Sequence, residues 1–130
     1  DRDGNVFVAY VEKGPDTPQQ HKVQRYDAQE GTWSAVGSIV HSTESTTTIR
    51  SFDIAVDPYG NPMFFFRNDN ENPVVAHFDA DTNNWGDLIN LSSGKAAELE
   101  LEVAPNGVAY ASYLVDNQLF VHKFDSPENQ

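Results

Sequence analysis

Two tryptophans stand out among the side chains that could bind a ligand, because their spacing recurs. Trp33 follows Asp27 by six residues, and Trp85 follows Asp79 by six residues. A flat indole ring can stack on the apolar face of a sugar, so both are candidates for a sugar-binding platform. The same place in a repeated pattern also suits a packing role, with each ring filling space beside a neighbouring strand. We expect the packing role with both rings buried, and we keep sugar stacking as the alternative.

The positions of the four histidines do not favour a shared metal site. His77 and His122 lie one step out of register in the repeated pattern. One step along a strand turns a side chain to the other face of the sheet, so the two do not converge. We expect His21 and His41 to lie in loops. We therefore expect no metal site made of histidines.

The first residues, Asp1-Arg-Asp3-Gly4-Asn5, resemble the start of a calcium loop, where alternating carboxylates meet one hard cation. The segment lacks the later bidentate glutamate of such loops. The corresponding turns, 57–61 and 104–108, keep few of its carboxylates. We expect a plain β-turn without a metal, and Asp1 and Asp3 as metal ligands are the alternative.

Familiar catalytic motifs are absent from the sequence. It has no Gly-x-Ser-x-Gly nucleophile elbow, no phosphate-binding glycine loop and no His-Glu-x-x-His zinc motif. We expect no catalytic residues and no cofactor, and more generally a protein that is not an enzyme. Twenty acidic residues offer many chance pairs, so a carboxylate pair for glycoside hydrolysis stays open.

The composition narrows the class of partner. Eight basic and 20 acidic residues give a formal net charge of −12, which repels the phosphates of nucleic acids and anionic membranes. No apolar run reaches about 18 residues, so we expect no insertion into a membrane. The absence of cysteine excludes disulfides, thiolate nucleophiles and cysteine-ligated zinc.

Two sequence patterns occur three times each. In the first, a turn-forming pair precedes a glycine and an apolar strand follows it, in segments 1–10, 57–66 and 104–113. Glycine supplies the positive φ that such a turn requires. The second pattern is Val-x-x-aromatic-Asp, in segments 23–27, 75–79 and 121–125. Successive copies of the two patterns are separated by similar numbers of residues, which indicates an internal repeat.

Alternating segments at 52–56 and 99–103 complete the repeated unit as its first strand. The unit is then strand A, a glycine turn, strands B and C, an aspartate turn, and strand D beginning at tryptophan. The pattern predicts almost no helix. It predicts strands over residues 52–57, 63–68, 74–79, 99–104, 108–114 and 119–125.

The stretch Phe78-Asp-Ala-Asp-Thr-Asn-Asn-Trp85 resembles the aromatic–aspartate…tryptophan part of kelch repeats, and Tyr26-Asp-Ala-Gln-Glu-Gly-Thr-Trp33 is similar. The hairpin Asp1-Arg-Asp-Gly-Asn-Val-Phe-Val8 resembles NHL repeats. The glycine pair that follows strand B in kelch blades is missing here. The resemblance therefore implies the architecture of a β-propeller, and it transfers no functional residues.

The implied fold class is all-β, with propeller blades of four antiparallel strands. About two and a half blades would be present: strands B to D of a first blade over 1–37, strands A to D of a second over 51–91, and strands A to C of a third over 97–125. Residues 37–51 and 92–97 would link the blades. A closed ring needs at least about four blades. We expect the missing blades to come from the rest of a longer polypeptide, with a second copy of the chain as the alternative.

Asp53 and Glu100 occupy the same place in the two copies of strand A. Strand A is innermost in a propeller, so these carboxylates could lie near a central channel and attract a cation. They could equally be the solvated residues of an alternating strand. We expect the solvated position for both.

The expected function is a non-enzymatic binding or scaffold module of a secreted or cell-surface protein. It would recognise a protein or a glycan through loops at the rims of the blades, because loops vary while strands hold the frame. The alternative is a segment of a propeller enzyme that acts on carbohydrate.

Overall fold

A computed structural model describes residues 1–15, 18–38, 41–43 and 52–125, with only the backbone described for 41–43. The described residues form strands and turns and contain no helix. In particular, the described part holds no long apolar helix that could cross a membrane. The strand pairs are antiparallel. The prediction of an all-β fold is confirmed.

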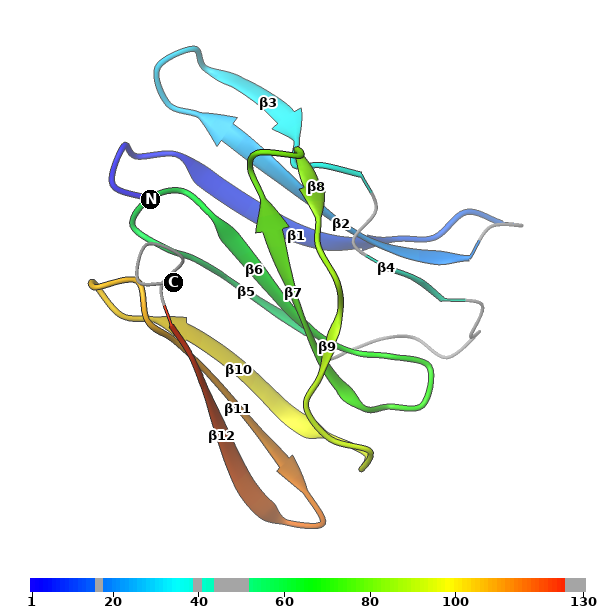
Figure 1. Cartoon of the computed structure of the whole chain (residues 1–130). Coiled ribbons are helices and arrows are strands. Elements are labelled where there is room, and N and C mark those ends of the chain that lie inside the picture. Colours follow the sequence, from blue (N-terminus) through cyan, green and yellow to red (C-terminus); the bar gives the residue numbers. More distant parts are fainter. Residues whose placement is uncertain (16–17, 39–40, 44–51, 126–130) are drawn as a thin grey trace.

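The strands form three antiparallel sheets, which we call sheets I, II and III (Figure 1). Sheet I consists of β1 (Val6–Glu12), β2 (Gln19–Asp27), β3 (Thr32–Ala35) and β4 (His41–Thr43). Sheet II consists of β5 (Phe52–Val56), β6 (Pro62–Arg67), β7 (Pro73–Asp79), β8 (Asn84–Trp85) and β9 (Ile89–Asn90). Sheet III consists of β10 (Ala97–Val103), β11 (Ala109–Val115) and β12 (Gln118–Phe124).

All six strands predicted from the sequence are present, with ends that differ by at most two residues. The expectation that His21 and His41 lie in loops was wrong, because the two residues are paired in the backbone register of strands β2 and β4. In β2, every second residue from Gln19 to Val23 is buried, so alternation extends further toward the N-terminus than the sequence suggested. Most of the expected link 37–51, and residue 51 at the start of the second predicted blade, lie outside the described residues.

The sheets stack face to face, with sheet II between the other two (Figure 1). Neighbouring residues of a strand point to opposite faces. In β6, Phe64 and Phe66 therefore pack toward Val23 of sheet I, and Phe65 packs toward Leu101 of sheet III. All three phenylalanines are completely buried. A strand that is apolar on both faces needs a sheet on each side, which explains the layered arrangement.

Corresponding positions of the sheets have the same cross-strand pairing. Tyr26 pairs with Trp33 in sheet I, and Phe78 pairs with Trp85 in sheet II. The ring centroids of these pairs lie 5.2 and 5.5 Å apart. The two tryptophans thus hold the same place in their sheets, as their spacing in the sequence predicted.

Candidate functional site

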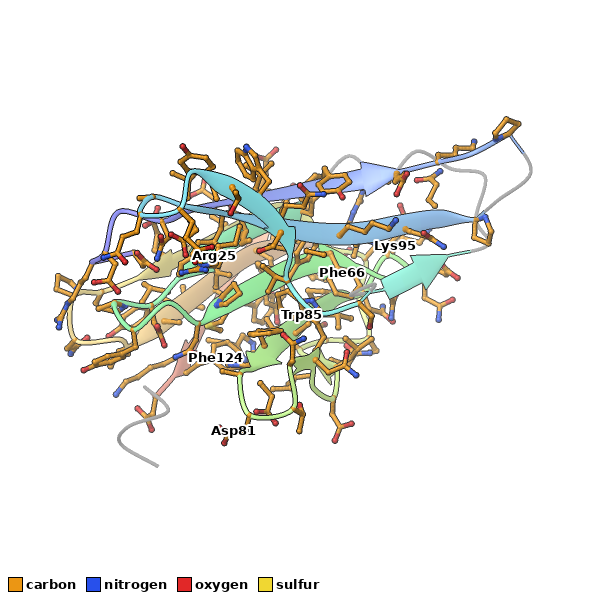
Figure 2. The ribbon with its side chains drawn as sticks, turned by 90° about the horizontal axis from the view of Figure 1, so that it is seen from above. Arg25, Phe66, Asp81, Trp85, Lys95 and Phe124 are labelled. Atoms are coloured by element: carbon orange, nitrogen blue, oxygen red, sulfur yellow. The ribbon has the colours of Figure 1, made fainter. Side chains whose placement is uncertain are left out.

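Each of the three sheets places at least one turn at the same end of the strands (Figure 1). We call this end the turn rim, and it comprises residues 1–5, 27–31, 57–61, 79–83 and 104–108. Figure 2 shows Arg25 and Asp81 toward this end and Lys95 toward the opposite end. The rim contains seven acidic residues and one basic residue. Its field therefore favours cationic or neutral ligands over anions.

Aspartate side chains hold the rim turns in shape. The Oδ1 atom of Asp57 accepts hydrogen bonds from the backbone N–H groups of Tyr59 and Asn61, both at 2.9 Å. Asp1 accepts from Asp3 and Asn5 in the same way, both at 3.0 Å. Such bonds give an acceptor to backbone N–H groups that a turn otherwise leaves without one.

These bonds bear on the alternative reading of Asp1 and Asp3 as metal ligands. The Asp1 carboxylate serves its own turn, and Asp3 is exposed. Among the described residues, no group of three or more histidine, aspartate or glutamate side chains is placed to hold a metal ion. The geometry of the segment is that of a turn.

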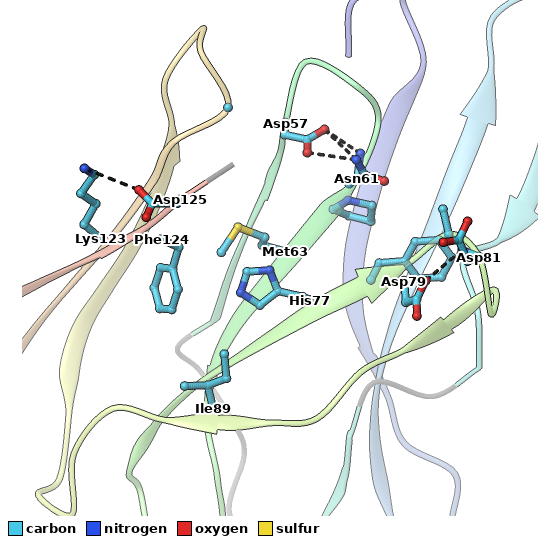
Figure 3. A pocket seen from close by; sticks show the side chains of 14 residues that line it. Asp57, Asn61, Met63, His77, Asp79, Asp81, Ile89, Lys123, Phe124 and Asp125 are labelled. Atoms are coloured by element: carbon cyan, nitrogen blue, oxygen red, sulfur yellow. Dashed lines mark hydrogen bonds and ion pairs between the residues drawn. The ribbon is translucent and has the colours of Figure 1, made fainter. Parts of the chain in front are cut away.

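A groove of about 710 Å³ opens on the turn rim between sheets II and III (Figure 3). Its lining includes the side chains of Met63, His77, Ile89 and Phe124, which come from both sheets. Carboxylates from several turns border it, together with one lysine. These charged residues are Asp57, Asp79, Asp81, Asp125 and Lys123.

His77 is the titratable side chain of the groove that burial affects most clearly. Its ring meets the ring of Phe124 edge to face, with centroids 5.5 Å apart and planes at 65°. Burial lowers the pKa of His77 below its ordinary value of 6.5. The imidazole is therefore neutral near pH 7, and a neutral imidazole offers one hydrogen-bond donor and one acceptor to a ligand.

A smaller groove of about 320 Å³ lies at the corresponding place between sheets I and II. It has Phe7 and Arg25 where the larger groove has Met63 and His77. Arg25 forms an ion pair with Asp27 at 3.3 Å, so its guanidinium is engaged within its own sheet. The larger groove differs by a neutral imidazole and a flexible thioether.

Asp53 and Glu100 do not line either groove. The Oδ2 atom of Asp53 accepts a hydrogen bond from the backbone N–H of Leu101 at 2.8 Å, which joins β5 to β10. Glu100 lies exposed on the outer face of sheet III. The expectation of a solvated carboxylate therefore fits Glu100 and was wrong for Asp53, because the neighbouring strand supplies a donor.

The two tryptophans differ in environment although their positions correspond. Trp85 is half-buried, and its Nε1 donates a hydrogen bond to the carbonyl oxygen of Val36 at 3.0 Å. Trp33 is 53% exposed, so the expectation that both are buried was wrong for Trp33. Trp85 faces sheet I, whereas Trp33 lies on the outer face of sheet I, where no sheet among the described residues covers it.

Reasoning from the sequence missed the groove, because its lining comes from segments far apart in the chain. It did separate His77 from His122 correctly, since His122 contacts the Tyr113 hydroxyl at 2.9 Å and is not part of the groove lining. One signal could have been read further. His77 takes the place of Arg25 and Lys123 in the Val-x-x-aromatic-Asp pattern, where a charged residue is otherwise present.

Comparison with known proteins adds information on the fold alone. No family model and no curated protein matches the sequence. The structure is similar to the crystal structure of a protein of unknown function from Dyadobacter fermentans, with a TM-score of 0.64 and 10% sequence identity. The match covers 97% of this chain and 36% of that chain. This chain therefore spans well under half the length of that protein, and the likeness concerns three-dimensional architecture.

Proposed function

We propose that the three sheets are blades of a β-propeller, and that the chain is a non-enzymatic binding module of a secreted or cell-surface protein. Its ligand is a protein or a glycan that binds the groove between sheets II and III. The observation that carries this proposal is the groove itself, with apolar residues in its lining and carboxylates along its border. Its volume of about 710 Å³ falls within the range of known ligand sites.

The arrangement of the sheets supports the propeller. Consecutive sheets pack face to face, and each follows the last along the chain. The first strands of sheets II and III, β5 and β10, lie against each other and are joined through Asp53 and Leu101. Blades of a propeller meet in this way around their innermost strands.

The groove carboxylates already interact with other groups of the chain, which favours a binding role over a catalytic one. Asp57 holds the β5–β6 turn, as described above. The Oδ1 atom of Asp79 accepts a hydrogen bond from the backbone N–H of Asp81 at 2.9 Å, and Asp125 lies 3.6 Å from the ammonium of Lys123. These groups hold turns and neutralise a cation, and neither role requires proton transfer to a substrate.

The groove chemistry suits a ligand with hydroxyl or amine groups beside an apolar face. Carboxylates accept hydrogen bonds from both kinds of group, and the imidazole of His77 can donate or accept. Met63 and Phe124 offer an apolar surface for a sugar ring or an aliphatic side chain. The net charge of −12 keeps such a module soluble outside the cell and away from anionic surfaces.

Nuclear magnetic resonance titration tests the proposal. Three probes are added separately to the isotope-labelled chain: chitohexaose, cellohexaose and a peptide of alternating lysine and leucine. We expect at least one probe to shift the signals of Met63, His77 and Phe124, with a Kd no weaker than about 1 mM. His77→Ala should weaken that binding, and the matched control Arg25→Ala, in the smaller groove, should leave it unchanged.

Two outcomes contradict the proposal. The first is a set of shifts that lie outside the groove, or the absence of shifts with all three probes. The second is cleavage of either oligosaccharide, detected by mass spectrometry after prolonged incubation, which would indicate an enzyme instead.

A further inference from the structure

The outer face of sheet I is apolar and exposed. Val6 and Val8 of β1 are 51% and 42% exposed, and Trp33 of β3 is 53% exposed. The cross-strand pairs Val6–Tyr26 and Tyr26–Trp33 place these side chains on one face of the sheet. We call this surface face I. Large apolar side chains grouped on one exposed face are characteristic of a binding surface.

The residues of face I correspond to residues of sheet II that are buried against sheet I. Counted from the turn glycine, Val8 corresponds to Phe64, and Tyr10 corresponds to Phe66. Phe64 is completely buried and belongs to the cluster that joins sheets I and II. Trp33 likewise corresponds to Trp85, which donates a hydrogen bond to Val36, the residue that directly follows β3 of sheet I. Face I is therefore built like a surface that packs on a preceding sheet.

The outer face of sheet III, which we call face III, corresponds to the other side of such a contact between sheets. Val121 is 59% exposed and corresponds to Val75 of sheet II and Val23 of sheet I. Val75 is buried against sheet III, and Val23 is buried against sheet II. Tyr110 is exposed on the same face as Val121. Face III is therefore built like a surface that packs on a following sheet.

The chain thus exposes both halves of one kind of interface. Two contacts join consecutive sheets, one between sheets I and II and one between sheets II and III. In each contact, the earlier sheet contributes a surface that corresponds to face III, and the later sheet contributes a surface that corresponds to face I. Among the described residues, one half of each kind has no sheet packed on it, and the two lie at opposite ends of the stack (Figure 1). A surface that fits face I is therefore present on another copy of the same chain.

We propose that face I binds face III of a second copy of this chain, head to tail. The interface continues the contact that already joins consecutive sheets, with Trp33 covered by the partner as sheet I covers Trp85. An interface between two different surfaces leaves a free half on each copy, so it propagates until it closes into a ring. The proposal depends on the stacking of the sheets and not on the ligand of the groove, so either can fail alone.

Sedimentation velocity of two blocked variants tests this arrangement. Val8→Lys blocks face I, and Val121→Lys blocks face III, while each leaves the other face intact. We expect the unmodified chain to associate as its concentration rises from the micromolar to the millimolar range. Each blocked variant should remain monomeric alone, and an equimolar mixture of the two should form a pair and stop there. Unchanged circular dichroism and thermal unfolding of the variants would show that each still folds.

Fluorescence provides a second readout. With Trp85→Phe, Trp33 becomes the single tryptophan of the chain. Its emission should move to shorter wavelength, and its quenching by acrylamide should decrease, as the chain associates. A monomeric chain at millimolar concentration with Trp33 fully quenchable overturns the proposal and assigns face I to a different partner. Association of Val121→Lys with itself also overturns it, because face I would then bind its own kind.

Discussion

Asp53 joins sheets II and III, and the loss of its side chain should destabilise the fold. Its Oδ2 atom accepts the hydrogen bond from Leu101 at 2.8 Å, and its Oδ1 atom accepts one from Ile54 at 2.8 Å. Hydrogen bonds to a charged group contribute about 1.5–3 kcal/mol each. The bond to Ile54 is local to the strand, so we count only the bond between sheets. Asp53→Ala should therefore lower the free energy of unfolding by about 2 kcal/mol.

Glu100 provides a matched control, because it holds the same place in β10 and is exposed. Glu100→Ala removes a carboxylate of the same charge, and its effect should stay within about 0.5 kcal/mol. Asp53→Asn keeps an acceptor oxygen without the charge, so its loss of unfolding free energy should lie between the losses of these two variants.

Urea unfolding, followed by tryptophan fluorescence, measures the effect. Chains of this size have m values of about 1–3 kcal/mol per molar urea, so the midpoint for Asp53→Ala should fall by about 1 M. The midpoint for Glu100→Ala should not move. Equal effects of the two alanine variants would refute the reasoning, since they would show that the Leu101 bond adds nothing to a generic loss of charge.

Three further results are expected. Phe64→Ala removes a completely buried ring and should destabilise the fold by about 3–5 kcal/mol, and a loss below about 1 kcal/mol would argue against the stacking of sheets I and II. In thermal unfolding, Trp85→Ala should cost more than Trp33→Ala, because Trp85 is half-buried and bonded to Val36; equal costs would contradict this. Burial lowers the pKa of His77, so its contribution to stability is complete above the ordinary pKa of 6.5 and decreases as the pH falls below that value. Urea unfolding across this pH range should show that His77→Gln loses less stability than the unmodified chain as the pH falls. An identical pH dependence of the two chains would contradict the prediction.

The strands could be predicted from the sequence because their signals are local. Alternation in segments such as 99–103 marks one buried face, and the turn glycines mark the ends of strands. Gly60, for example, has a φ of +88°, which an L-residue rarely adopts. β9, with two residues, is too short to show alternation, and its pairing with β7 depends on the rest of sheet II.

The candidate site could not be predicted in the same way, because it depends on contacts between sheets. The sequence places Trp33 and Trp85 in equivalent positions, and it carries no information about which sheet covers each one. The groove depends on His77 and Phe124, which are far apart in the chain and meet only when sheets II and III pack. Periodicity specifies the faces of a strand, whereas the partner of each face is a property of the assembled fold.

Corresponding positions in the three sheets separate the effect of residue type from the effect of surroundings. The valine of the Val-x-x-aromatic-Asp pattern is buried in sheets I and II, as Val23 and Val75, and is exposed in sheet III as Val121. The residue is the same in all three sheets, so the neighbouring sheet alone accounts for the difference. Trp33 and Trp85 show the same dependence on a neighbouring sheet, on the faces opposite to those of the valines. Both comparisons indicate that the sequence of each sheet suits two neighbours, and that sheets I and III each have one within the described chain.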